Sequence, residues 1–291
     1  MAGRRILQQP ACRLRAEAVQ YPPFGAGTHQ MQALLNTAVK AARAGGDIAM
    51  RYLHRVYELD VRTKARNEFV SQVDHAAEDA IIETIRERYP DHAFLAEESG
   101  VRGDSDHVWI IDPLDGTTNF LHSFPVFSVS IALRLHGRLE LGVIYDPSRQ
   151  ELFTTIRGQG AQLEGRRIRV SPRPSLEGAL IGTGFPYRSH EVWLQRYMHM
   201  LASVLQNTAG VRRPGSAALD LAWLAAGRLD GFWEFDLNVW DIAAGSLMIR
   251  EAGGLVSELQ DENDYLETGN IVAGTPKVHD ALKTLLQSHL D

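Results

Sequence analysis

The chain has 291 residues, 44% hydrophobic and 23% charged, which is the composition of an ordinary globular protein long enough to bury a full core. Its net charge of −6 argues against nonspecific binding of nucleic-acid phosphates, and no apolar run approaches the ~20 residues that a membrane span needs. The only cysteine is Cys12, which excludes disulfides and thiolate zinc sites within the chain and fits a reducing compartment.

The first 30 residues differ from the rest of the chain. Arginines outnumber the single acid, Glu17, and the run Tyr21-Pro22-Pro23-Phe24-Gly25 would break any helix. We expect residues 1–30 to be a disordered extension, or the product of a translation start assigned too early, with Met31 as the real first residue. An arginine-rich, acid-poor leader is also typical of a targeting peptide. The predicted folded domain therefore spans 31–291.

Two helices are predicted before the first strand. Apolar residues recur near the 3.6-residue period from 31 to about 53, and again from near Asp74 to Tyr89, where Pro90 stops the second helix. Asp74 lies in the first turn of that helix, where the helix dipole stabilises a carboxylate. On its own, this position indicates a structural role for Asp74.

A short strand at 93–95 is followed by two adjacent glutamates, Glu97 and Glu98. Adjacent glutamates usually belong to a solvated loop. Here they follow an apolar strand and precede the next apolar strand, 109–111, by one loop. If these strands are neighbours in a sheet, Glu97 and Asp112 end at the same sheet edge.

The stretch 109–120 carries the clearest chemical signal. Its apolar start predicts a short buried strand, which Pro113 is expected to end because proline has no N–H for a ladder. Asp112 and Asp115 then lie three apart on the turn leaving the strand, close enough to share a hard cation. The following Gly116-Thr117 pair offers backbone N–H groups that suit a phosphate. The structural alternative is that Asp112 caps a helix and Asp-Gly forms an ordinary turn.

The rest of the chain reads as strands and helices without internal repeats. Alternating patterns at 128–135 and 139–146 flank His136-Gly137 and indicate a hairpin. Asp241 opens a predicted helix, so alone it would be a cap or first-turn acid, and Glu234 lies in an aromatic strand. The other predicted elements are strands at 151–155, 167–171, 178–185, 232–235, 255–259 and 270–274, and helices at 190–206, 217–226, 240–251 and 276–290.

Three separated motifs together resemble the signature of the inositol monophosphatase family: Ala96-Glu97-Glu98, Asp112-Pro113-Leu114-Asp115-Gly116-Thr117 and Trp240-Asp241-Ile242-Ala243-Ala244-Gly245. The resemblance covers about 31–291 and departs from the family at Ala96, where glycine is usual. Members are Mg²⁺-dependent, lithium-sensitive phosphatases. The resemblance implies an α/β fold, a layered αβαβα sandwich of the inositol monophosphatase and fructose-1,6-bisphosphatase type, in a cytoplasmic homodimer.

By the same resemblance, an N-terminal half (about 31–175) carries most metal ligands, and a C-terminal half (about 176–291) carries Asp241 and the substrate contacts. The site lies between the halves. Asp112 would bridge two Mg²⁺ ions, and Asp74 would help to hold a third, weaker one. The implied ligands of the first ion are Glu97, Asp112 and the backbone carbonyl of Leu114, and those of the second ion are Asp112, Asp115 and Asp241.

The implied reaction is hydrolysis of a small phosphate monoester, foremost myo-inositol 1-phosphate, by direct attack of a metal-activated water. Glu97 and Thr117 would orient that water, with Asp74 as a further catalytic residue. The N–H groups of Gly116 and Thr117 would bind the phosphate, and Glu234 would bind the hydroxyls of the substrate.

Other interpretations stay open. The same motifs serve phosphatases of histidinol phosphate, fructose 1,6-bisphosphate and 3′-phosphoadenosine 5′-phosphate. The chain also looks especially like bacterial members that double as partners in ribosomal RNA transcription antitermination, where binding would matter more than catalysis. Haloacid-dehalogenase-type phosphatases use an Asp-x-Asp-Gly-Thr string, but here the carboxylates are three apart, which moves the first one off the geometry for attack.

Overall fold

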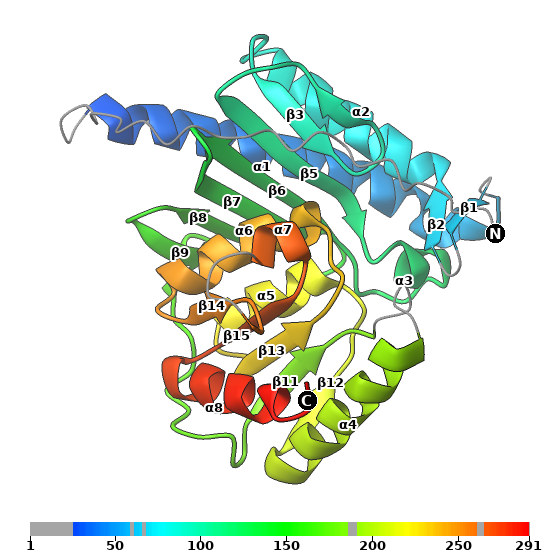
Figure 1. Ribbon diagram of the computed structural model, residues 1–291. Helices are drawn as coiled ribbons and strands as arrows, with labels where there is room; N and C mark the ends of the chain where they lie inside the picture. The colour runs from blue at the N-terminus through cyan, green and yellow to red at the C-terminus, as the bar shows by residue number, and fades with distance from the viewer. Residues whose placement is uncertain (1–25, 59–60, 66–67, 186–190, 261–264, 291) are drawn as a thin grey trace, which may run out of the picture.

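Helices and sheets alternate in five layers through the part of the chain that the computed structural model describes, residues 26–58, 61–65, 68–185, 191–260 and 265–290 (Figure 1). One pair of helices covers the outer face of an eight-stranded sheet, a second pair lies between this sheet and a five-stranded sheet, and a third pair covers the far face of the latter. The αβαβα sandwich expected from the sequence is confirmed. The three pairs are α1 (Ala26–Tyr52) with α2 (Gln72–Arg86), α5 (Ala217–Ala225) with α6 (Val239–Glu251), and α4 (Glu191–Asn207) with α8 (Pro276–Gln287).

The first sheet has the strand order β10-β9-β8-β7-β6-β5-β3-β4. Its β3 and β5 are parallel neighbours, with Ala96 opposite Ile111, so the expected meeting of these two strand ends is observed. The other pairs are antiparallel. The strands are β3 (Ala93–Ala96), β4 (Gly100–Arg102), β5 (His107–Asp115), β6 (Ser128–Leu135), β7 (Arg138–Asp146), β8 (Glu151–Ile156), β9 (Gly160–Leu163) and β10 (Arg166–Ile168).

The second sheet has the order β12-β11-β13-β15-β14. Because β11 and β13 are parallel neighbours, with Thr183 opposite Trp233, both strands end at the same edge of the sheet. These strands are β11 (Leu180–Thr183), β12 (Gly210–Arg212), β13 (Gly231–Glu234), β14 (Leu255–Ser257) and β15 (Ile271–Gly274). The remaining short elements are η1 (Leu53–Glu58), β1 (Val61–Ala65), β2 (Glu68–Ser71), α3 (Thr117–Leu121) and α7 (Tyr265–Thr268).

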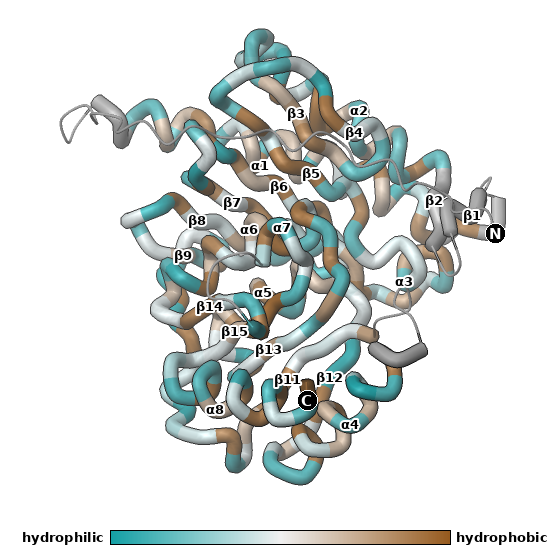
Figure 2. Tube along the Cα trace, in the orientation of Figure 1, coloured by the Kyte–Doolittle hydropathy of each residue, from teal (hydrophilic) through white to brown (hydrophobic). Residues whose placement is uncertain are grey.

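A hydrophobic core fills each space between layers. Consecutive residues of one strand serve different cores: Val143 packs under α1 and α2, whereas Ile144 packs under α5 and α6. Phe232 and Trp233 divide in the same way between the two faces of the second sheet. Figure 2 shows the resulting hydrophobic residues along the inner strands and hydrophilic residues at the outer turns. Each large side chain buried in this way stabilises the fold by about 1.5–3 kcal/mol.

Two helix boundaries differ from those expected. The first helix begins at Ala26, five residues before Met31, and α2 runs from Gln72 to Arg86. The expectation for residues 1–30 falls mostly outside the described residues. None of the described helices has the length and apolar character that crossing a membrane needs.

The prediction that Pro113 ends its strand was wrong. The strand β5 continues to Asp115, and its pairing with β6 shifts register between Asp112 and Asp115. Such a bulge leaves Pro113 out of the ladder, so its missing N–H costs no hydrogen bond. The two carboxylates therefore lie on a bulged strand end, not on a turn that follows it.

Candidate active site

One cleft, of about 710 Å³, opens where the central strands of both sheets end. It is lined from the first sheet by the ends of β3 and β5, and from the second sheet by the ends of β11 and β13. Arg213 is the only lysine or arginine among its described lining residues, so the cleft is strongly acidic. Its seven acidic lining residues are Glu97, Asp112, Asp115, Asp220, Glu234, Asp236 and Asp241.

Three of these acids converge. One oxygen each of Asp112, Asp115 and Asp241 lies within 4.8 Å of the other two. Burial raises the pKa of Asp112 well above its usual range, and the nearby charges of Glu97, Asp115 and Asp241 raise it further. Carboxylates crowded in this way repel one another, and a hard divalent cation with oxygen ligands would relieve that repulsion. The donor set therefore fits Mg²⁺, and it unites the expected ligands of the second ion.

The bulge of β5 orients two of the expected ligands. The backbone N–H of Leu114 donates to Asp112 Oδ1 across 3.0 Å. The Leu114 carbonyl accepts a hydrogen bond from the Thr117 hydroxyl, also at 3.0 Å. A carbonyl oxygen has two lone pairs, so this bond still leaves the Leu114 oxygen able to bind a cation.

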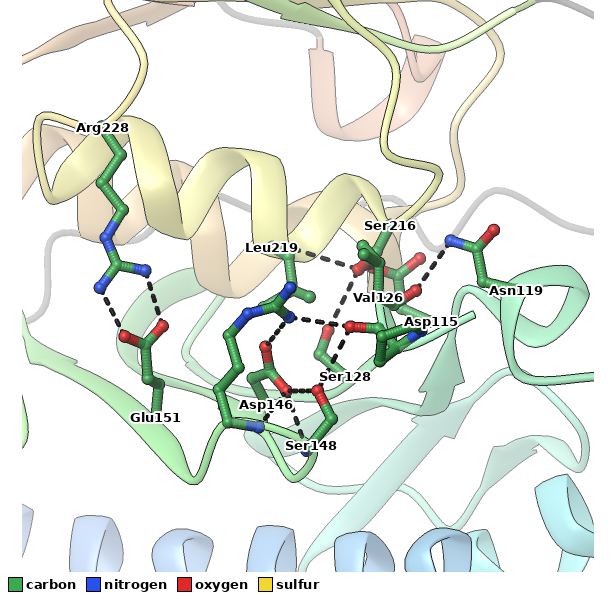
Figure 3. Close-up of polar contacts among 12 residues, drawn as sticks. Asp115, Asn119, Val126, Ser128, Asp146, Ser148, Glu151, Ser216, Leu219 and Arg228 are labelled. Atoms are coloured by element: carbon green, nitrogen blue, oxygen red, sulfur yellow. Dashed lines mark hydrogen bonds and ion pairs between the residues drawn. The ribbon is translucent and has the colours of Figure 1, made fainter. Parts of the chain in front are cut away.

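Asp115 is held by the opposite side of the cleft. Its Oδ2 accepts a hydrogen bond of 2.5 Å from the hydroxyl of Ser216, the N-cap of α5 (Figure 3). It also accepts one of 2.8 Å from the N–H of Ala218. Burial raises the pKa of Asp115 to about 6, although these two hydrogen bonds act in the opposite direction. Asn119 adds a second tie, because its Nδ2 donates to Val126 O and to Pro214 O, both at 2.8 Å. Sequence reasoning missed both anchors.

The Gly116-Thr117 turn is built on α2. Gly116 has φ +93°, and a Cβ there would lie 2.9 Å from Val126 O, so only glycine fits. Thr117 Oγ1 lies 3.0 Å from Oδ1 of the completely buried Asp74. Asp74 therefore supports the turn from α2. Its contact with Thr117 is a structural role that also bears on the proposed function of the turn.

A second α2 carboxylate, Glu78, supports the Glu97 loop. Glu78 is buried, and it accepts a hydrogen bond of 2.8 Å from the N–H of Glu98. Glu97 itself is fixed through its backbone, whose N–H donates to Ile111 O at 3.1 Å. Sequence reasoning missed Glu78, although an acid one turn after Asp74 on the apolar face of α2 was a usable signal.

Two further acids that line the cleft, Asp241 and Glu234, come from the C-terminal half of the chain. Asp241 Oδ2 accepts from the backbone N–H of Asn238 across 2.7 Å, which caps the first turn of α6. The Asp241 side chain thus caps α6 and also belongs to the cluster of converging carboxylates. Glu234 ends β13 and lines the cleft while only 8% exposed. The structure places it beside Gly184, where a Cβ would lie 1.7 Å from Glu234 Oε1.

Comparison with known proteins places this chain in a family. The sequence profile of the inositol monophosphatase family matches residues 30–291. The chain is 51% identical over 265 residues to the Nus factor SuhB of Pseudomonas aeruginosa, covering 89% of this chain and 98% of that protein. The crystal structure of extragenic suppressor protein suhB from Bartonella henselae has a TM-score of 0.85 at 46% identity, covering 88% of this chain and 98% of that one. An inositol monophosphatase from Anabaena has a TM-score of 0.76 at 38% identity, covering 89% and 97%.

Proposed function

Because the chain belongs to the inositol monophosphatase family, we propose that it is a Mg²⁺-dependent phosphatase whose substrate is myo-inositol 1-phosphate. The observation that carries the proposal is the convergence of Asp112, Asp115 and Asp241, with oxygens within 4.8 Å, beside the Gly116-Thr117 turn. This arrangement would give the cleft a cation site and, beside it, an anion site. A phosphate monoester is a ligand that needs both.

The residues of the cleft then have distinct roles. Glu97, Asp112, the Leu114 carbonyl, Asp115 and Asp241 would hold two Mg²⁺ ions, which when bound supply charge neutralisation for the phosphate and activation of a water.

The chain itself positions the reactants. The backbone N–H groups of Gly116 and Thr117 would bind phosphate oxygens, and Asp74 fixes the Thr117 hydroxyl through their 3.0 Å contact. With Glu97, that hydroxyl would orient the attacking water. Glu234, which ends a strand of the second sheet, would accept hydrogen bonds from the leaving group. As the P–O bond breaks, the leaving oxygen would take up the proton that the attacking water gives up.

Phosphate release from four esters tests the proposal: myo-inositol 1-phosphate, histidinol phosphate, fructose 1,6-bisphosphate and 3′-phosphoadenosine 5′-phosphate. We expect the highest kcat/KM for the inositol ester with Mg²⁺, and loss of turnover after chelation. Undiminished turnover after chelation would refute the metal assignment. A higher kcat/KM for another ester would make that ester, and not myo-inositol 1-phosphate, the proposed substrate.

A second function is favoured by one observation, the 51% identity to a Nus factor over 98% of that protein. We propose that the chain also binds the transcription antitermination machinery as a homodimer. Immobilised wild-type protein and the variant Asp112→Asn should capture the same transcription factors, because binding would not need the metal. Capture that disappears with the metal-site substitution, or a monomer by sedimentation, would contradict this proposal.

A further inference from the structure

Asp220 is a buried carboxyl that the roles assigned so far do not use. It lies in the first turn of α5, is only 1% exposed and lines the cleft. Among the described residues, its Oδ1 has no hydrogen-bond partner. Buried polar atoms are nearly always paired, and an unpaired one destabilises the fold. An atom of this kind at the edge of a ligand cleft indicates a partner that arrives with the ligand.

Asp220 is separate from the converging carboxylates. The oxygens that come together belong to Asp112, Asp115 and Asp241, and Asp220 is not among them. Burial raises the pKa of Asp220 well above its usual range, and the neighbouring charges of Glu234 and Asp115 raise it further. Because its oxygens do not join the cluster of converging carboxylates, we assign Asp220 to the organic part of the ligand and not to the cation.

Two glycines of one segment lie beside the two carboxyl groups: Gly182 of β11 is next to Asp220, and Gly184, just after β11, leaves room for Glu234. A Cβ at Gly182 would lie 3.6 Å from Asp220 Cγ, and a Cβ at Gly184 would overlap the Glu234 carboxyl at 1.7 Å. The two carboxyl groups therefore lie near one another in the lining of the cleft, and the charge of Glu234 acts on Asp220. The Gly116-Thr117 turn lines the same cleft, so the leaving group of a phosphate held there would share that cleft with Asp220 and Glu234.

We propose that Asp220 is a specificity-determining residue whose carboxyl hydrogen-bonds to a hydroxyl of the leaving group, so that the cleft selects phosphate esters of polyols. The inference rests on the proposed phosphatase function and deepens it. Rotation about the last side-chain bond of Asp220 exchanges its two oxygens, so either can turn toward the ligand. A site built to bond a hydroxyl discriminates strongly against analogues that lack it.

The test compares Asp220→Leu and Asp220→Asn with wild type on two esters, myo-inositol 1-phosphate and phenyl phosphate. The phenyl ring of the second ester carries no hydroxyl group. Asp220→Leu should lower the ratio of the two kcat/KM values at least tenfold, whereas Asp220→Asn, which keeps a polar group, should restore most of it. Asp220→Leu should also melt at a higher temperature, because it removes an unpaired buried oxygen. The matched control is Asp230→Leu, which should melt lower, because the buried Asp230 accepts a hydrogen bond of 2.8 Å from the N–H of Leu180.

Two results would overturn the inference: an unchanged ratio in Asp220→Leu, or equal losses on both esters together with a lower melting temperature. If the wild type hydrolyses neither ester, the proposed function fails, and calorimetric binding of myo-inositol 1-phosphate decides the inference. Tenfold weaker binding by Asp220→Leu would support it, and equal binding would overturn it.

Discussion

Replacing Ser216 by alanine separates the positioning of the proposed metal ligand Asp115 from ordinary helix capping. Ser216 has two tasks: its hydroxyl donates to Asp115 at 2.5 Å, and it accepts from the N–H of Leu219 at 3.4 Å as the cap of α5. Loss of a cap costs about 1 kcal/mol, and loss of a hydrogen bond to a charged group costs about 1.5–3 kcal/mol. We therefore expect Ser216→Ala to lower the free energy of unfolding by about 2.5–4 kcal/mol.

The functional effect should exceed the loss of stability. Removing a group that orients a metal ligand typically lowers metal affinity 10–100-fold, so the Mg²⁺ concentration for half-maximal phosphate release should rise by about that factor. The matched control is Thr275→Ala. Thr275 caps α8 through the N–H of Val278 and also donates to Arg173 O, but it does not line the cleft.

The assay is a Mg²⁺ titration of phosphate release by both variants, with denaturant unfolding of the same preparations. Both variants should lose stability, and only Ser216→Ala should need more Mg²⁺. If Ser216→Ala has a normal Mg²⁺ requirement, or if Thr275→Ala shifts it equally, the hydroxyl does not position Asp115 and the reasoning is refuted.

Three further predictions concern other parts of the structure. Glu78→Leu, which removes the acceptor of the Glu98 N–H at 2.8 Å, should lower kcat/KM by a larger free-energy equivalent than its loss of unfolding free energy; equal free-energy changes in paired kinetics and melts would make Glu78 merely structural. Lithium should inhibit uncompetitively by occupying the second metal position, which contains Asp241, after the chemical step; competitive inhibition in steady-state kinetics would contradict this. The wild type should lose stability as the pH falls from 6.5 toward 4. Burial and the charge of a neighbouring histidine lower the pKa of His92 to about 4 in the folded protein, whereas the His92 imidazole of the unfolded chain binds a proton near pH 6.5, so acid favours the unfolded state. This loss should be smaller in His92→Gln, and equal slopes in melts across this pH range would rule out His92 as the cause.

The carboxylate cluster was accessible to sequence reasoning because its members are tied to local patterns. An apolar strand that runs into Asp112 and Asp115 predicts acids at a sheet edge, and the strand pair β3 and β5 brings Glu97 to the same edge. Pro113 misled the prediction, because a bulge depends on the pairing partner β6 and not on the strand itself.

The supporting residues could not be found in the same way. Ser216 lies 101 positions from Asp115, and nothing in its own sequence surroundings indicates that contact. Asp220 looks like an ordinary first-turn acid until its burial and its unpaired oxygen are known. Glu78 is the exception, since its place on the apolar face of α2 is visible in the helical period.

The most direct test of the account is a Mg²⁺ titration of myo-inositol 1-phosphate hydrolysis by Asp112→Asn beside wild type, with thermal melts of both. Asp112 would contact both ions, so its replacement should lower kcat/KM on the order of 10³-fold, which corresponds to about 4 kcal/mol. The metal-free variant should melt no lower than wild type, because neutralising one of the crowded carboxylates relieves their repulsion. Near-normal turnover, or a loss of activity that merely follows unfolding, would contradict the claim that Asp112 is the centre of a catalytic metal site.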